Sequence, residues 1–305
     1  MRAGPVADVR RAVGAIIAGG CIVGCQPNDA PAQVVAPTHF EVTGVFRDTR
    51  LDESSGVAVS RGLAGVLWTH NDSGDKATLY AVDSAGTLLG TYTIAGARAV
   101  DWEDIALGPC PDTPRTCLYI ADTGDNSGSR ASVDIYVVEE PLVRPSTGEN
   151  LGTLQARRLR IRYADGSQDV EAVAITPSGT LLLISKGRGR PIGVYHVPAG
   201  DILRDSVTVQ RAQELDIVPQ RGFGRQVTGA ATSPDGSLVV VRTYIELAFY
   251  SLTETLHLVE GPKCLIAGHE LQGEAVDFVD DSTLVLTSEA VLGRPGTISR
   301  VRCPI

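Results

Sequence analysis

The chain has 305 residues, 43% of them hydrophobic and 21% charged, and carries a formal net charge of −9 at pH 7. This length can bury one large core or two small ones. The acidic balance argues against nucleic-acid binding, because a surface without excess basic residues does not replace the counterions of phosphates.

The N-terminus has the composition of an export signal. Arg2, Arg10 and Arg11 form a basic region, and residues 12–24 form a short run of apolar and small residues. The run is too short to cross a bilayer as a helix but suits the apolar region of a signal peptide. Residues 1–24 hold three of the 27 basic and one of the 36 acidic residues, so the chain without them carries a net charge of −11.

The signal region ends in Ile22-Val23-Gly24-Cys25, which resembles the lipobox of bacterial lipoproteins. The resemblance implies that residues 1–24 are removed as a lipoprotein signal peptide and that Cys25 becomes the lipidated first residue. The protein would then be extracytoplasmic and attached to a membrane by its lipid, at the outer membrane or the cell surface. An ordinary cleaved signal and a membrane anchor are the alternatives.

The next segment, residues 25–38, predicts a flexible tether, because Pro27, Pro31 and Pro37 stand among small and polar residues. Helical periodicity is almost absent after it. Short runs of Val, Ile, Leu, Thr and Tyr alternate with turn-forming Gly, Pro, Asp and Ser. Residues 39–305 are therefore expected to form a single all-β domain.

One segment recurs five times in this domain, each time followed by a turn and a second apolar run. Successive copies begin 48, 68, 57 and 46 residues apart, which is typical of β-propeller blades with about four strands each. Small residues within the copies suit an innermost strand, where blades converge. The copies are Ser55–Val59, Glu103–Leu107, Glu171–Ile175, Thr228–Thr232 and Glu274–Phe278.

We predict a five-bladed β-propeller; a six-bladed ring and a β-sandwich with chance similarity are the alternatives. The fifth unit runs out after "GTISRVRC", one strand short. The stretch "HFEVTGVF" (39–46), which precedes the first unit, is expected to supply that strand. It would close the ring and remove an exposed sheet edge.

Four further cysteines lie in the domain, and an oxidising compartment would let them form disulfides. "CPDTPRTC" (110–117) has the form of a turn between strands closed by its own bridge, Cys110–Cys117. That leaves Cys264 with Cys303, although four cysteines permit three pairings. A metal site is the other alternative, but no CxxC pair or nearby histidine accompanies them.

The first residues of the five copies should surround one mouth of the central channel, because all innermost strands begin on the same face. Three carboxylates around a narrow axis do not all stay ionised unless a cation offsets them, and calcium takes such oxygen ligands. We predict one central calcium ion. Water, another ion, or glutamates that simply bond to backbone amides are the alternatives. The predicted ligands are Ser55, Glu103, Glu171, Thr228 and Glu274.

The order Ser, Glu, Glu, Thr, Glu resembles the central calcium ring of the calcium-activated nucleotidase (apyrase) family, whose five blades contribute Ser, Glu, Glu, Ser and Glu. The resemblance is confined to these five positions and the blade count, and Thr228 replaces a serine. The stretches "ESSG", "HNDSGD", "DWEDIA", "DTGDN" and "GEA" resemble a family of bacterial secreted propeller proteins. That second resemblance spans most of the mature chain and implies no activity.

Two acidic turns, "NDSGD" (71–75) and "DTGDN" (122–126), should end the second strands of units one and two at the same mouth. Asp72 and Asp122 are expected to point toward it. Asp75 and Asp125 suit local turn hydrogen bonds instead.

The matching positions in units three to five are Lys186, Arg242 and Glu289. An anionic group could bridge the metal to Lys186 and Arg242, because basic side chains bind oxyanions. Alternatively, these basic residues pair with Asp72, Asp122 or Glu289 across the mouth.

Nucleophilic catalysis has weaker support, so no catalytic residue is assigned. Ser54 or Ser55 with His70 and Asp72 supplies the residue types, but neither serine lies in a GxSxG elbow. The sequence favours a lipid-anchored propeller with a central calcium site that binds an anionic small molecule or a protein partner. The alternative is a calcium-dependent hydrolase of phosphoesters or nucleotides with the metal as Lewis acid, because fold alone does not decide function.

Overall fold

The computed structural model describes residues 1, 4, 32–143, 148–217 and 223–305. The chain divides into Met1–Pro31 and a compact unit, Ala32–Ile305. The predicted lipidation site Cys25 and nearly all of the predicted signal peptide lie outside the described residues. No helix in the described ranges is long and apolar enough to cross a membrane.

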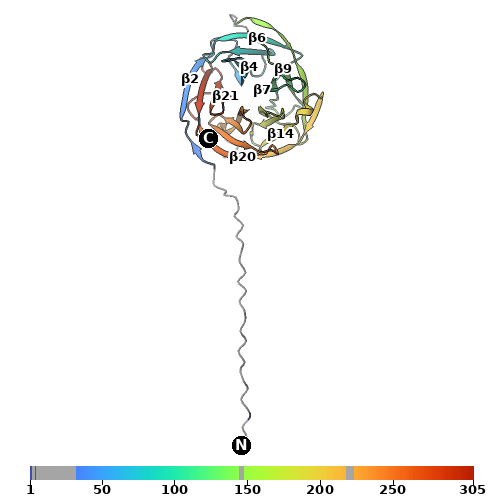
Figure 1. Ribbon diagram of the computed structural model, residues 1–305, viewed down its shortest axis with the longest axis vertical. Coiled ribbons are helices and arrows are strands. Elements are labelled where there is room, and N and C mark those ends of the chain that lie inside the picture. The colour runs from blue at the N-terminus through green and yellow to red at the C-terminus, as the bar shows by residue number, and fades with distance from the viewer. Residues whose placement is uncertain (2–3, 5–31, 144–147, 218–222) are drawn as a thin grey trace. The chain divides into compact units, whose positions relative to one another are not determined.

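The described part of Ala32–Ile305 forms five sheets arranged around a common centre, which confirms the predicted five-bladed β-propeller (Figure 1). Four antiparallel strands make up each blade, from the centre outward. Blade 1 comprises β3 (Ser54–Val59), β4 (Leu67–Asn71), β5 (Thr78–Val82) and β6 (Leu88–Ala95). Blade 2 comprises β7 (Trp102–Pro109), β8 (Thr116–Asp122), β9 (Val133–Glu139) and β11 (Arg157–Tyr163). Blade 3 comprises β12 (Val170–Ile175), β13 (Leu181–Ser185), β14 (Ile192–Val197) and β16 (Arg211–Leu215).

Blade 4 comprises β17 (Val227–Thr232), β18 (Leu238–Thr243), β19 (Glu246–Leu252) and β20 (Leu258–Leu265). Blade 5 comprises β21 (Gly273–Asp280), β22 (Thr283–Ser288), β23 (Thr297–Arg302) and β2 (His39–Val45). The connections include two short 3-10 helices, η1 (Ala199–Asp201) and η2 (Phe223–Arg225).

The ring closes as predicted, because β2 pairs antiparallel with β23 from His39 opposite Arg302 to Val45 opposite Thr297. The first strand of the domain thus completes the blade that the end of the chain leaves one strand short. The otherwise unpaired edge of β23 is covered.

Three further strands add a fifth member to three blades, which the sequence pattern did not predict. β1 (Val34–Val35), β10 (Asn150–Gln155) and β15 (Ser206–Val209) pair in parallel with β20, β6 and β11. Each lies just before the outermost strand of its own blade and joins the outermost strand of the preceding blade. These strands therefore link neighbouring blades at the rim.

The hydrophobic core lies between neighbouring blades rather than in one central mass. Five clusters of buried side chains fill the spaces between successive blades, and one of them joins blade 5 to blade 1. Around the axis the inner strands approach closely: a Cβ on Gly56 would lie 2.7 Å from the Ile105 nitrogen of the next blade. The small residues of the repeated segment are therefore required by close packing.

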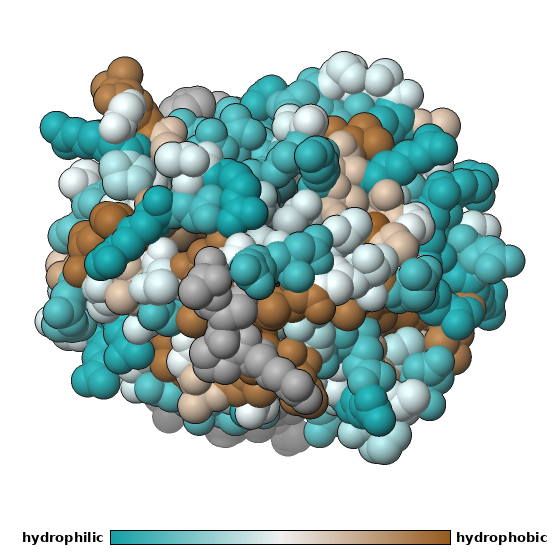
Figure 2. Space-filling model, turned by 90° about the horizontal axis from the view of Figure 1, so that it is seen from above, coloured by the Kyte–Doolittle hydropathy of each residue, from teal (hydrophilic) through white to brown (hydrophobic). Residues whose placement is uncertain are grey.

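Both predicted disulfides are present. Cys110 and Cys117 have Cα atoms 4.9 Å apart, and Cys264 and Cys303 have Cα atoms 6.0 Å apart. The second bridge joins β20 of blade 4 to the residue after β23 of blade 5, beside the closure. Two disulfides indicate an oxidising, extracytoplasmic compartment. In Figure 2 hydrophilic residues predominate on the visible face, with apolar residues in separate patches between them.

Candidate cation and ligand site at the channel mouth

The five predicted ring residues all lie at the same irregularity of their strands. In every blade the pairing of the innermost strand with the second strand shifts register at the repeated position. Such β-bulges re-aim a side chain. The residues in the shifts are Ser55, Glu103, Glu171, Thr228 and Glu274, each 2–6% exposed.

The two hydroxyl members of this ring differ in their hydrogen bonding. Ser55 Oγ donates to the backbone carbonyl of Glu103 at 2.6 Å. Thr228 Oγ1 is buried and has no hydrogen-bond partner among the described residues. Since burying a hydroxyl without a partner costs free energy, Thr228 offers an oxygen that a bound ligand or ion could use.

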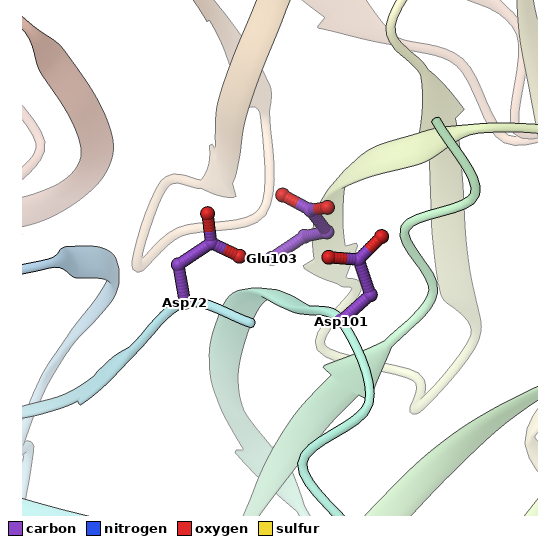
Figure 3. A group of neighbouring side chains, drawn as sticks. All are labelled: Asp72, Asp101 and Glu103. Atoms are coloured by element: carbon purple, nitrogen blue, oxygen red, sulfur yellow. The ribbon is translucent and has the colours of Figure 1, made fainter. Parts of the chain in front are cut away.

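Carboxylates gather in two groups that share Glu103. The first is Asp72, Asp101 and Glu103, and the second is Glu103, Asp169 and Glu171. Within each group, one carboxylate oxygen from each residue lies within 4.8 Å of the corresponding oxygens of the others. Figure 3 shows Asp72, from the turn after β4, and Asp101, just before β7, on either side of Glu103. These oxygens are ligands that a hard cation prefers.

Asp101 and Asp169 were missed in the sequence analysis, although a signal exists. Each lies two residues before a ring glutamate, in "DWE" (101–103) and "DVE" (169–171). The same offset holds acidic or amide residues in the other units: Glu53, Gln226 and Gln272. Because acidic or amide residues recur at this offset in all five units, the offset could have predicted them.

The electrostatics of the two groups are dominated by burial. Burial raises the pKa of Glu103 well above its ordinary value, and the neighbouring Glu171 and Asp72 raise it further. Burial also raises the pKa of Glu171 to about 8, although Lys186 counteracts it. The pKa of Asp101 is raised to about 6, first by burial and then by Asp72. The raised pKa values mean that a cation competes with protons for these carboxylates.

Gly124, the glycine of the second acidic turn, packs directly against these carboxylates. A Cβ at this position would overlap the Oε1 atom of Glu103 and the Oδ2 atom of Asp101. Its amide also donates to the carbonyl of Asp101 at 3.2 Å. Because Gly124 has no side chain, its backbone can lie directly against the carboxylates of Glu103 and Asp101.

The two turns place their first aspartates differently. Asp72 reaches the mouth as predicted and joins the first carboxylate group. Asp122 is fully buried: its Oδ1 accepts the backbone N–H of Asp101 at 3.1 Å and pairs with Arg130 Nη2 at 2.9 Å. Asp122 thus holds the Asp101 backbone and Arg130 through Oδ1, while its buried Oδ2 has no hydrogen-bond partner among the described residues.

The second aspartates make turn hydrogen bonds, as predicted. Asp75 accepts from the Asn71 side chain at 2.8 Å and from the Lys76 amide at 2.6 Å. Asp125 accepts the amide N–H groups of Ser129 and Arg130 at 2.8 and 2.9 Å.

Lys186 and Arg242, the predicted basic ligand-binding residues, both form ion pairs with glutamates. Lys186 Nζ lies 2.6 Å from Glu171 Oε1, and both side chains are buried. Arg242 is fully buried and pairs with Glu270. These acids are not the partners considered from the sequence, Asp72, Asp122 and Glu289.

Glu289 lies half-buried near the mouth and accepts a hydrogen bond from Gln272. Burial, followed by the charge of Asp72, raises the pKa of Glu289 to about 7. Glu274 also has a pKa raised to about 8 by burial and by Glu289. The acidic character of the mouth thus continues around to blade 5.

The serine and histidine residues considered for nucleophilic catalysis do not form a hydrogen-bonded pair in the described structure. His70 is buried, its Nδ1 lies 2.9 Å from the Asn71 carbonyl, and burial lowers its pKa to about 4. Ser54 bonds to the Thr69 hydroxyl at 2.9 Å, and Ser55 bonds to a backbone carbonyl. The arrangement supports a structural role for His70.

No protein-family model matches the chain, and no curated protein sequence matches it. Among solved structures, the PQQ-bound form of aldose sugar dehydrogenase from Streptomyces coelicolor is 15% identical with a TM-score of 0.52, covering 88% of this chain and 99% of that chain. The apo-form of soluble aldose sugar dehydrogenase from Escherichia coli is 12% identical with a TM-score of 0.49, covering 86% and 99%. At such identity the first similarity shows the fold alone: this chain is similar to the Streptomyces coelicolor enzyme as a β-propeller.

Proposed function

We propose that the domain binds calcium at the channel mouth and uses it to hold an anionic small molecule or a protein partner. The observation that carries this proposal is the sharing of the buried Glu103 by two groups of carboxylates. So many carboxylates close together repel one another when ionised, and a cation removes that repulsion. Calcium accepts six to eight oxygen ligands in flexible geometry, which suits carboxylates from different blades.

The residues present fit such an ion. Glu103, Asp169 and Glu171 would supply the first ligands, and the unpartnered hydroxyl of Thr228 would offer a further oxygen. Ser55 and Glu274 complete the predicted ring. When bound, calcium would supply positive charge at the mouth; the blades position the carboxylates and exclude bulk water from them.

Calorimetric titration of the full-length, metal-free protein with calcium tests this function. Binding should stabilise the fold, by about 2.7 kcal/mol at a free calcium concentration near 100 times the dissociation constant. Glu103→Gln and Glu171→Gln should each lose most of this gain. Glu254→Gln, at an exposed turn, is the matched control. Wild-type protein that neither binds calcium nor unfolds at a higher temperature with it would refute the proposal.

We also propose that the protein is a lipoprotein held at the outer membrane or cell surface through Cys25. The support is the lipobox-like sequence together with the disulfides, which suit an extracytoplasmic protein. Mass spectrometry of the mature protein should find a diacylated Cys25 at the N-terminus. An unmodified N-terminus beyond residue 25 would contradict it.

The alternative function is a calcium-dependent hydrolase of phosphoesters or nucleotides. The observation that favours it is that two carboxylate groups sharing one glutamate can hold two cations, an arrangement used in phosphoester hydrolysis. Turnover of phosphoesters in calcium, absent in chelator and in Glu103→Gln, would support a hydrolase. Calcium binding without turnover would leave the binding function.

A further inference from the structure

A small polar notch opens beside the second carboxylate group, on the segments that connect strands of blades 2 and 3. The cavity measures about 200 Å³, and Asp169 of that group lines it. The other residues that matter here are Asn126, Arg188 and Arg190, which also line it. The notch is thus contiguous with the proposed cation site.

Two arginines at the notch are available to a ligand, unlike the basic residues first expected to bind one. Arg188 and Arg190 are exposed. The Arg188 guanidinium makes no hydrogen bond or ion pair with the residues that the structure describes, and Arg190 donates to the Ser167 carbonyl at 3.2 Å. Lys186 and Arg242, by contrast, are paired with buried glutamates.

Arg188 lies between two glycines in the turn that connects β13 to β14. Gly187 and Gly189 flank it with φ values of 81° and 64°. Residues other than glycine rarely adopt this left-handed backbone conformation. The side-chain amide of Asn126 lies on the facing segment and adds a further hydrogen-bond donor.

The attraction of the notch for an anion depends on whether the cation site is filled. Two arginines face two aspartates, Asp125 and Asp169. Asp125 is held by backbone amides of its own turn, and Asp169 Oδ1 accepts the Asp125 amide at 2.8 Å. The four charges balance, so an anion gains little from the metal-free notch. A divalent cation on Asp169, Glu103 and Glu171 would offset the charge of Asp169 and would have coordination positions left for an anion beside the two arginines.

We infer that this notch is an oxyanion subsite, which takes a compact dianion such as the phosphoryl group of a phosphate monoester when a cation occupies the adjacent carboxylates. Arginine forks bind phosphoryl oxygens in pairs, and the notch has room for one such group. This inference rests on the proposed calcium site and names the ligand chemistry that the site would take. Because the two sites are coupled, each ligand must raise the affinity for the other by the same factor.

Calorimetric titration of full-length protein with phenyl phosphate, in chelator and in saturating calcium, tests the subsite. We expect calcium to strengthen phenyl phosphate binding by about tenfold or more, within the usual range of coupling between sites. In calcium, the double variant Arg188→Ala/Arg190→Ala should bind phenyl phosphate at least tenfold more weakly than wild type does. It should still bind calcium. Arg162→Ala/Arg300→Ala, which removes two exposed arginines elsewhere, should behave as wild type.

The outcomes separate the two proposals. One outcome is that wild-type protein binds calcium while its affinity for phenyl phosphate is unchanged by calcium or by the loss of Arg188 and Arg190. That result overturns the subsite and leaves the calcium site intact. Wild-type protein that does not bind calcium overturns both. Benzyl alcohol serves as the uncharged probe, and binding equal to that of phenyl phosphate also overturns the subsite.

Discussion

Glu103 belongs to both carboxylate groups, so its protonation affects the charge of both. Its buried carboxylate is surrounded by Glu171, Asp72 and Asp101 with Lys186 as a nearby cation. Lys186 offsets one of these negative charges, and protons or a metal ion must offset the others. Which of the two does so should depend on pH and on calcium.

The stability of the metal-free protein should therefore fall as pH rises. Glu171 and Glu274 have folded-state pKa values raised from 4.5 to about 8 by burial. A raised pKa gives stability that is full below the unfolded value and is lost as pH climbs through the folded value. Thermal unfolding in chelator should show a decreasing midpoint from pH 4.5 to 8. Calcium should flatten this decrease, and equal pH profiles with and without calcium would contradict the prediction.

A substitution at Thr228 should change stability in opposite directions in the metal-free and calcium-bound proteins. The buried hydroxyl of Thr228 has no partner among the described residues, so Thr228→Val should not destabilise the metal-free protein and should relieve a cost of about 1–3 kcal/mol. If the hydroxyl binds calcium, the same change should reduce the stabilisation by calcium. Thr228→Ser is the control. Chemical unfolding in chelator and in calcium measures both, and equal calcium stabilisation of all three proteins would exclude Thr228 as a ligand.

At the scale of elements, β2 completes blade 5 from the opposite end of the domain. Its hydrogen bonds to β23 cover a strand edge and hold the first and last strands of the ring together. A chain lacking residues 1–45 should therefore unfold at a much lower temperature than one lacking residues 1–37, which keeps β2. Circular dichroism melting compares them. Equal midpoints would show that the closure contributes little.

The sequence predicted the blade elements well because their pattern is local. Turn residues and apolar runs mark the second and third strands, and the repeat spacing marks the first. The sequence did not predict three strands, β1, β10 and β15. Each of them pairs with a strand of a neighbouring blade that is distant in the sequence. Nothing in "NLGTLQ" (150–155) distinguishes such a strand from a loop.

At the scale of the molecule, the two disulfides should differ in their contributions. Cys110–Cys117 closes a separation of 7 residues, and Cys264–Cys303 closes 39 and joins two blades. Loop-closure entropy gives about 2 and about 4 kcal/mol respectively. Denaturant unfolding of Cys110→Ala/Cys117→Ala and Cys264→Ala/Cys303→Ala measures both losses. A larger loss from the first pair would contradict the entropic argument.

The sequence by itself determined the blade number, the closing strand, the favoured cysteine pairing and the five ring positions. These follow from repeat spacing, from one missing strand and from local turn chemistry. Only the tertiary structure decided which charged residues meet. Asp101 and Asp169 join the ring glutamates, whereas Asp122 and Arg242 form buried ion pairs with Arg130 and Glu270. Such pairings depend on burial and on side-chain direction across blades, and apart from the two-residue offset of Asp101 and Asp169 no sequence spacing indicated them.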